Sequence, residues 1–215
     1  GRAIYVAAKS GVPDPDLNQT LKKEIERAKK EQVSADVIKR AIEKAKGGSN
    51  ESYTPERYEG FGPGNSMWIV DCLTDNHNRT LTAVRTAFNK TGGTVGTSVG
   101  YLFSRKAQFV FEGMTEDEAM EALMMGDADC EEITVDEDGF VTILADPKDY
   151  ESIKAALDAV NSELEFEECG VNLVPSTYVD LDEEHEAKFR RFLDLLSECD
   201  DVQDVHHNAN IVVEE

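Results

Sequence analysis

Residues 67–90, MWIVDCLTDNHNRTLTAVRTAFNK, change their pattern of apolar side chains halfway along. The first seven residues form an apolar run of the length of a strand, whereas the last thirteen space their apolar residues as a helix does. The polar turn LTDNHNRT (73–80) lies between the two patterns. The stretch therefore predicts a strand, a turn and a helix in direct succession. The apolar side of the predicted helix consists of Leu81, Val84, Ala87 and Phe88.

Strand and helix patterns continue to alternate as far as the end of the chain. Over residues 107–173 their order is βαββαβ, which is a split βαβ unit of ferredoxin-like topology. A βαβ set precedes this unit and another follows it, so we expect a second ferredoxin-like domain that the first one interrupts. Neither domain carries an iron–sulfur cysteine pattern, so the name describes topology only. The predicted elements are 67–73, 78–90, 99–103, 108–113, 115–125, 130–135, 139–146, 148–160, 164–174, 176–181, 183–198 and 202–214.

The first 48 residues show helical patterns only. Residues 14–32 place an apolar side chain every three or four positions, Pro15 suits the start of this helix, and the opening residues are consistent with the end of another helix. In the helix that follows, Ser34 is a suitable N-cap and two glycines, Gly47 and Gly48, provide a stop. The prediction is an α+β protein with a small N-terminal helical domain and two ferredoxin-like βαββαβ domains, the second inserted within the first. The expected domains are 1–56 (helices and linker), 57–105 plus 175–215 (interrupted domain) and 106–174 (acidic insert).

The composition is that of an ordinary globular protein, with 40% hydrophobic and 31% charged residues among 215. No apolar run approaches the roughly 20 residues of a membrane span, and the first residues contain no secretory signal. The four cysteines are widely separated, which is typical of reduced thiols in a cytosol. We therefore expect a cytoplasmic protein without a membrane partner.

The net charge of −22 argues against binding to nucleic-acid phosphates, but it is unevenly distributed. Residues 1–50 have a net charge of +4 and residues 57–105 of +2, whereas residues 106–174 have −17 and residues 175–215 have −9. The protein is therefore bipolar, with a basic first half that the total charge conceals.

The turn at residues 73–80 has two interpretations. Asp75, Asn76 or Asn78 can cap the following helix, but Arg79 in the first turn opposes the helix dipole unless an anion or a carboxylate meets it. In one interpretation the turn is a structural cap and Arg79 pairs with an acidic neighbour. In the other, backbone amides and Arg79 hold a phosphate, with Arg85 as a more distant member of the site.

Two glycine-rich stretches flank this unit. RYEGFGPGNS (57–66) matches no phosphate-loop pattern and predicts a turn into the strand, with Tyr58 and Phe61 packed beneath it. TGGTVGTSVG (91–100) predicts a helix stop and a flexible connection. A nucleic-acid contact at the second stretch is an alternative, because small residues let a backbone approach closely.

Five motifs together resemble the YebC/PmpR family, which includes a mitochondrial translational activator of cytochrome oxidase. They are VAAKSG (6–11), RYEGFGPG (57–64), DCLTDNHNRT (71–80), FNKTGG (88–93) and YLFSRK (101–106). The resemblance implies one helical and two α/β domains without known catalytic activity. It also implies a cytoplasmic gene-expression factor: many members are labelled probable transcriptional regulators that bind DNA, and others act on the ribosome during translation.

The expected nucleic-acid contacts lie on the helical domain and at the turn. One hypothesis is a duplex-DNA surface of low sequence specificity, since no helix-turn-helix or zinc pattern is present. Another is rRNA within the ribosome, which accommodates the acidic insert more easily because basic proteins are available to it there. A third possibility is a solvated face in which these residues pair with nearby glutamates. The candidate residues are Lys23, Arg27, Lys30, Lys39, Arg40, Lys44, Lys46, Asn76, Asn78, Arg79 and Arg85.

An enzyme and a docking module are the alternatives from other classes. Cys72, Asp75 and His77 are close in sequence, but strand alternation turns Cys72 to the face opposite Asp71, toward the core. His206 and His207 point to opposite faces of a strand, so they cannot share one metal. We expect no catalytic residue, no metal and no cofactor. A module that docks basic proteins at the acidic insert stays open.

Overall fold

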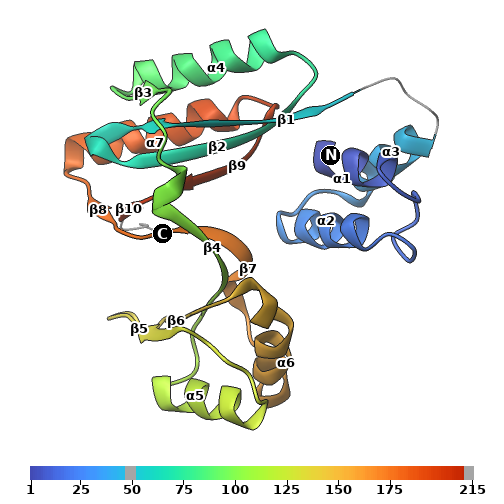
Figure 1. Ribbon diagram of the computed structural model, residues 1–215, viewed down its shortest axis with the longest axis vertical. Coiled ribbons are helices and arrows are strands. Elements are labelled where there is room, and N and C mark those ends of the chain that lie inside the picture. The colour runs from blue at the N-terminus through green and yellow to red at the C-terminus, as the bar shows by residue number, and fades with distance from the viewer. Residues whose placement is uncertain (47–51, 211–215) are drawn as a thin grey trace. The chain divides into compact units, whose positions relative to one another are not determined.

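The computed structural model describes residues 1–46 and 52–210 (Figure 1). It is an α+β structure that forms two compact units, one of Gly1–Val99 with Val179–Glu215 and the other of Gly100–Tyr178. The second unit is inserted into the chain of the first, and its limits lie a few residues outside the expected insert 106–174. Two predictions lie outside the described residues: the helix stop at Gly47 and Gly48, and the last residues of the predicted strand 202–214.

Three helices, α1 (Arg2–Lys9), α2 (Gln19–Lys30) and α3 (Ala35–Lys46), form the N-terminal segment. Helix α2 begins at Gln19 and not near Pro15, because Asn18 is its N-cap: the Asn18 side chain accepts a hydrogen bond from the Leu21 amide at 3.0 Å. The same side chain donates to the carbonyl of Ala7 at 2.9 Å, which fastens α1 to the start of α2. The buried residues that form the common core of this segment are Ile4, Ala7, Ala8, Leu21, Ala28 and Ile38.

A four-stranded sheet covered by two helices completes the first unit. Its order is β3-β1-β2-β9, and all of its pairings are antiparallel. Trp68, Phe88 and Phe192 meet in the core beneath the two helices, with ring centroids 4.5–4.7 Å apart for the Trp68–Phe192 and Phe88–Phe192 pairs. The strands are β1 (Thr54–Phe61), β2 (Met67–Thr74), β3 (Thr94–Val95) and β9 (Val202–His207), and the helices are α4 (His77–Lys90) and α7 (Glu183–Ser197).

The expected turn at RYEGFGPGNS is wrong for its first half, because Thr54–Phe61 is strand β1, paired with β2 along its whole length. Gly60 is needed for packing and not for turning: a Cβ there would lie 2.2 Å from the carbonyl oxygen of Thr94 in β3. Only Pro63–Asn65, a short 3₁₀ turn that contains Gly64 at φ +64°, reverses the chain. The sheet therefore gains a strand that the sequence pattern did not predict.

The expected strand at residues 99–103 is also wrong. Gly100–Leu102 is a 3₁₀ turn, and one continuous strand, β4 (Phe103–Phe111), replaces the two predicted segments. Ala107, Phe109 and Phe111 alternate inward along β4, so its polar start belongs to the same strand as its apolar end.

The predicted strand at 176–181 shrinks to β8 (Val179–Asp180), which pairs in parallel with β10 (Ala209–Asn210) in a sheet separate from the four-stranded one. Each half of the first unit keeps the predicted strand–helix–strand order, as β2-α4-β3 and β8-α7-β9. The differences are the additional strands β1 and β10 and the position of β8 outside the four-stranded sheet.

The second unit contains, in chain order, β4, α5, β5, β6, α6 and β7. Its sheet has the order β5-β6-β4-β7 with antiparallel pairings throughout. Apolar residues of both helices and of the strands form one core, which includes Phe109, Phe111, Ile143, Ile153 and Leu157. The remaining elements are α5 (Glu116–Met125), β5 (Glu132–Val135), β6 (Val141–Ala145), α6 (Tyr150–Val160) and β7 (Phe166–Pro175).

Candidate nucleic-acid interface

The turn between β2 and α4 is built around a helix cap. Asn76 is the N-cap of α4, and its side-chain oxygen accepts a hydrogen bond from the Arg79 amide at 3.1 Å. The hydroxyl of Thr74 in turn accepts from the Asn76 amide at 2.9 Å. Capping satisfies a backbone donor that has no partner within the helix. Of the three predicted cap residues, Asn76 has this role, and Asn78 lies exposed in the first turn of α4.

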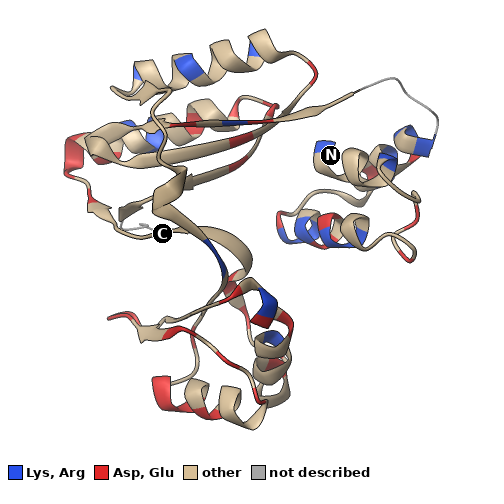
Figure 2. Ribbon diagram, viewed as in Figure 1, with Lys and Arg blue, Asp and Glu red and all other residues tan. Residues whose placement is uncertain are grey.

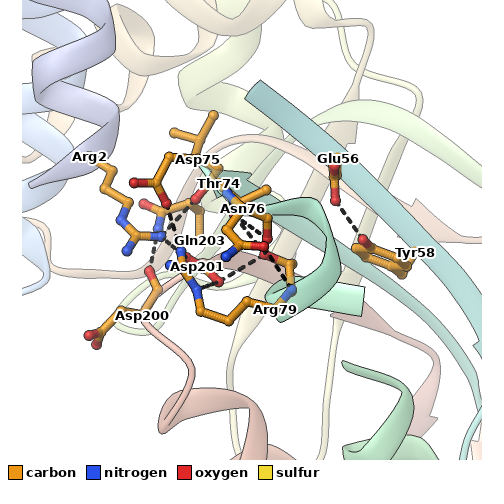
Figure 3. Close-up of polar contacts among 12 residues, drawn as sticks. Arg2, Glu56, Tyr58, Thr74, Asp75, Asn76, Arg79, Asp200, Asp201 and Gln203 are labelled. Carbon is orange, nitrogen blue, oxygen red and sulfur yellow. Dashed lines mark hydrogen bonds and ion pairs between the residues drawn. The ribbon is translucent and has the colours of Figure 1, made fainter. Parts of the chain in front are cut away.

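Arg79 pairs with two carboxylates at the same helix end (Figure 3). Its Nε and one terminal nitrogen contact the two oxygens of Asp201 at 3.0 and 2.7 Å, and that terminal nitrogen also contacts Asp75 at 2.8 Å. The Asp201 side chain is only 3% exposed, and it also accepts from the Thr80 hydroxyl at 2.8 Å. The Arg79 guanidinium holds the pKa of the Asp201 carboxyl well below its usual range, with Arg2 and Thr80 adding to the effect.

Of the two roles that the sequence left open for Arg79, the structure contains the pairing with an acidic neighbour. Asp201 follows α7 and lies 122 positions from Arg79, so no local spacing rule could have identified it. The carboxylate also offsets the unfavourable interaction between Arg79 and the helix dipole. Whether Arg79 in addition contacts a phosphate stays a prediction.

Asp201 also joins the N-terminal helices to the sheet. Arg2 of α1 pairs with Asp201 and donates to the carbonyl of Leu73 at 2.8 Å, so two arginines from different elements share one buried carboxylate (Figure 3). Arg27 of α2 makes a second link, because it pairs with Asp204 of β9 as well as with Glu31. Arg27, predicted as a phosphate ligand, is therefore engaged in ion pairs within the protein.

The other predicted basic residues of the helical segment are exposed. Figure 2 shows lysines and arginines along α2 and α3. Lys23, Lys39 and Arg40 make no ion pair within the described residues, and Lys44 lies over the ring of Tyr5, 5.9 Å from its centroid. Arg85 is likewise exposed on α4 and unpaired within the described part of the chain. The exposed candidates are Lys23, Lys30, Lys39, Arg40, Lys44, Lys46 and Arg85.

The residues considered for an enzyme do not form a site. Cys72 is buried in the core beneath the sheet, and burial raises the pKa of its thiol to about 12, which leaves it uncharged near neutral pH. His77 contacts Glu56 at 2.7 Å, and Asp75 contacts Arg79. Over residues 1–46 and 52–210 no group of three or more His, Cys, Asp or Glu side chains could hold a metal ion. Within the same residues, every helix is too short or too polar to cross a membrane.

Comparison with known proteins identifies relatives over the whole chain. Residues 53–209 match the family model described as the second and third domain of TACO1/YebC, and residues 1–48 match that of the TACO1/YebC protein N-terminal domain. A probable transcriptional regulatory protein of Pseudoalteromonas translucida is 49% identical over 98% of this chain and 88% of its own length. One from Marinomonas sp. is 50% identical over 97% and 88%. The crystal structure of a conserved hypothetical protein from Aquifex aeolicus is similar, with a TM-score of 0.75 and 34% identity over 99% of this chain and 88% of that one.

Proposed function

Because the chain belongs to the TACO1/YebC family, whose curated relatives are named probable transcriptional regulatory proteins, we propose that it is a non-enzymatic gene-expression factor of the cytoplasm that binds nucleic acid. The binding surface is the exposed basic side chains of α2 and α3. The observation that carries this proposal is the contrast between these side chains and the arginines that the protein uses internally. Arg2, Arg27 and Arg79 are held by carboxylates, whereas Lys23, Lys39 and Arg40 are exposed and unpaired within the described residues.

The basic helices favour phosphate contacts and not base readout. Lysines on a solvated helix release counterions when they meet a phosphate backbone, and this gain does not depend on sequence. Asn78 and Arg85, both exposed on α4, are proposed as further contacts, while Arg79 pairs with Asp75 and Asp201 at the start of the helix. We propose duplex DNA as the target, in line with the names of the relatives.

rRNA within the ribosome is the second candidate, and the acidic unit favours it. Residues 100–178 contain 4 basic and 20 acidic side chains. Free DNA repels such a unit and offers it no partner, whereas a ribosome presents basic proteins as well as phosphate. Both targets would contact the same basic side chains of α2 and α3. They differ in whether basic proteins are present for the acidic unit to contact.

A salt titration tests the proposed surface. We expect the double variant Lys39→Gln/Arg40→Gln to weaken binding to a short fluorescent duplex and to lower the slope of log K against log salt by about 2, since each lost phosphate contact removes nearly one released counterion. The matched control is Lys148→Gln/Lys154→Gln, which makes the same charge change on the acidic unit and should leave the slope unchanged. Equal slopes for the two double variants would contradict the proposed surface.

A parallel titration with purified ribosomes separates the two targets. DNA binding that persists at near-physiological salt would support the regulator, whereas tight ribosome binding with DNA binding only at low salt would support the translation factor. Arg79→Glu is a poor probe in either series, because it removes the partner of the buried Asp201 and is expected to destabilise the fold.

We also assign both α/β domains to ferredoxin-like topology, with limits 57–105 plus 175–215 and 106–174 after the helical domain 1–56. The sheet order β5-β6-β4-β7 and the two helices between its strands support this assignment for the insert. For the interrupted domain the supporting observation is one four-stranded antiparallel sheet with α4 and α7 packed on a common core.

A further inference from the structure

Helix α5 of the acidic unit exposes three methionines. Met120 is 46% exposed, and Met124 and Met125 are each 79% exposed. The opposite side of the helix, with Ala119, Ala122 and Leu123, is buried in the core. Met120 and Met124 are four positions apart, so they lie next to each other on the helix surface. We call the three exposed residues the methionine face.

Carboxylates stand beside each of these methionines. Glu116 and Asp117 precede Met120 by four and three positions, and Glu121 precedes Met124 and Met125 by three and four, so each acidic side chain neighbours a methionine. Within the described residues none of the three carboxylates has an ion-pair partner, and α5 contains no basic residue. The face is therefore apolar at its centre and negative at its border.

This combination defines the chemistry of a partner. Methionine is flexible and polarisable, and exposed methionines adapt to apolar side chains of different shapes. Unpaired carboxylates beside them favour lysine and arginine and repel phosphate, anionic lipid and the same face of a second copy. An amphipathic helix with apolar residues on one side and basic residues on the other satisfies both requirements.

We propose that the methionine face of α5 is a docking surface for a basic, amphipathic protein segment. The proposal goes beyond nucleic-acid binding and uses none of the residues of α2 and α3. It gives the acidic unit a protein partner, and that partner contributes both charge and apolar side chains.

Fluorescence anisotropy with the full chain and a synthetic peptide probe tests the proposal. The probe is a helical peptide of leucine and lysine in an amphipathic arrangement, and two control peptides keep its charge: one has the same composition in scrambled order, and one replaces leucine by glycine. We expect the amphipathic probe to bind at least tenfold more tightly than either control. Methyl resonances of Met120, Met124 and Met125 should shift when it binds.

Two pairs of matched variants locate the site. Met120→Gln/Met124→Gln should weaken probe binding at least tenfold, whereas Met120→Leu/Met124→Leu, which keeps the face apolar, should stay within about twofold, a difference of less than 0.5 kcal/mol. Glu116→Gln/Asp117→Asn should weaken binding more than Glu137→Gln/Asp138→Asn, which removes two charges from the exposed β5–β6 turn. The Lys39→Gln/Arg40→Gln variant should bind the probe as wild type does, so a failure of the nucleic-acid proposal would be seen separately.

Three results would overturn the docking surface. One is equal binding of the amphipathic and glycine-substituted peptides, since charge alone would then account for the attraction. Another is wild-type affinity in Met120→Gln/Met124→Gln. The third is a dimer in sedimentation experiments that the same double variant abolishes, because a second copy of the chain would then be the occupant.

Discussion

Replacing Asp201 by asparagine tests whether one buried carboxylate stabilises the first unit by pairing with arginines from two different helices. The carboxylate is shared by Arg2 from α1, by Arg79 from α4 at 2.7 and 3.0 Å, and by the Thr80 hydroxyl at 2.8 Å. Asparagine has nearly the same shape, so the substitution removes the charge without leaving a cavity. The two guanidinium groups then face each other without the carboxylate between them.

The expected loss of stability is about 3 kcal/mol. Removing one partner of a buried ion pair costs about 3–5 kcal/mol, because the remaining charge is left uncompensated. The Asp201 side chain is 3% exposed, but the Arg79 side chain is 48% exposed and can be hydrated again, which favours the lower end of that range. A loss of this size corresponds to about 10 °C in the melting temperature of a unit of this length.

Urea unfolding followed by tryptophan fluorescence measures the stability loss of Asp201→Asn in the first unit, which contains both Asp201 and Trp68. Trp68 is the only tryptophan of the chain, and it lies in the core beneath α4 and α7. The midpoint should fall while the dependence of the unfolding free energy on urea stays constant. Asp200→Asn is the matched control, because it makes the same charge change at the adjacent, exposed position and should alter stability by no more than about 0.5 kcal/mol.

Acid titration gives a second test of the same carboxylate. The folded pKa of Asp201 lies below the value of about 3.9 expected in the unfolded chain. Its stabilising contribution is therefore complete above that value and is lost as the pH falls toward the folded pKa. The stability difference between wild type and Asp201→Asn should shrink between about pH 5 and pH 2. Equal effects of Asp201→Asn and Asp200→Asn at neutral pH would refute the reasoning.

Two further substitutions probe the environment of Trp68. His207 packs on Trp68 with ring centroids 4.9 Å apart, and burial lowers the pKa of its imidazole to about 4. NMR titration should show the His207 imidazole neutral at pH 6. Because only the unfolded chain protonates this imidazole between about pH 6.5 and 4, the free energy of unfolding of the wild type should fall over that range. His207→Phe should remove this part of the pH dependence. Ser66→Ala should cost about 1–3 kcal/mol in urea unfolding, because the buried indole N–H of Trp68 donates to the Ser66 hydroxyl at 2.7 Å and would lose its partner, whereas Ser66→Thr should retain part of the stability.

The sequence predicted those parts of the fold in which periodicity is local. Helices α4, α6 and α7 and strand β2 lie close to where the apolar patterns place them. Strand β1 was missed because glycine and proline in RYEGFGPGNS are strong turn signals, whereas Gly60 in fact provides room for the backbone of β3. Whether Gly60 serves a turn or close packing is decided by Thr94, which lies on another strand. A rule based on spacing within one stretch could not have recovered it.

The candidate site shows the same limit. Asn76 was among the cap residues proposed from its place before a helix, and a cap depends only on its next three residues. The partner of Arg79 depends on the return of the chain after the inserted unit, which brings Asp201 to the start of α4. From sequence alone, a carboxylate of the protein and a bound phosphate were equally suitable as the anion that Arg79 requires in the first turn of α4. The distance along the chain was the missing information.

The return of the chain also explains why a strongly acidic protein can keep a basic surface. The segment after the insert is negative, but Asp201 and Asp204 in it are matched by Arg2, Arg27 and Arg79. Arginine suits this role, because its planar fork bonds two carboxylate oxygens at once. Carboxylates engaged in this way contribute little repulsion at the exposed faces of α2 and α3. The net charge of the whole chain therefore does not describe its local surfaces, and under the proposed function the charge left unpaired on α2 and α3 is the quantity that should decide where a nucleic acid binds.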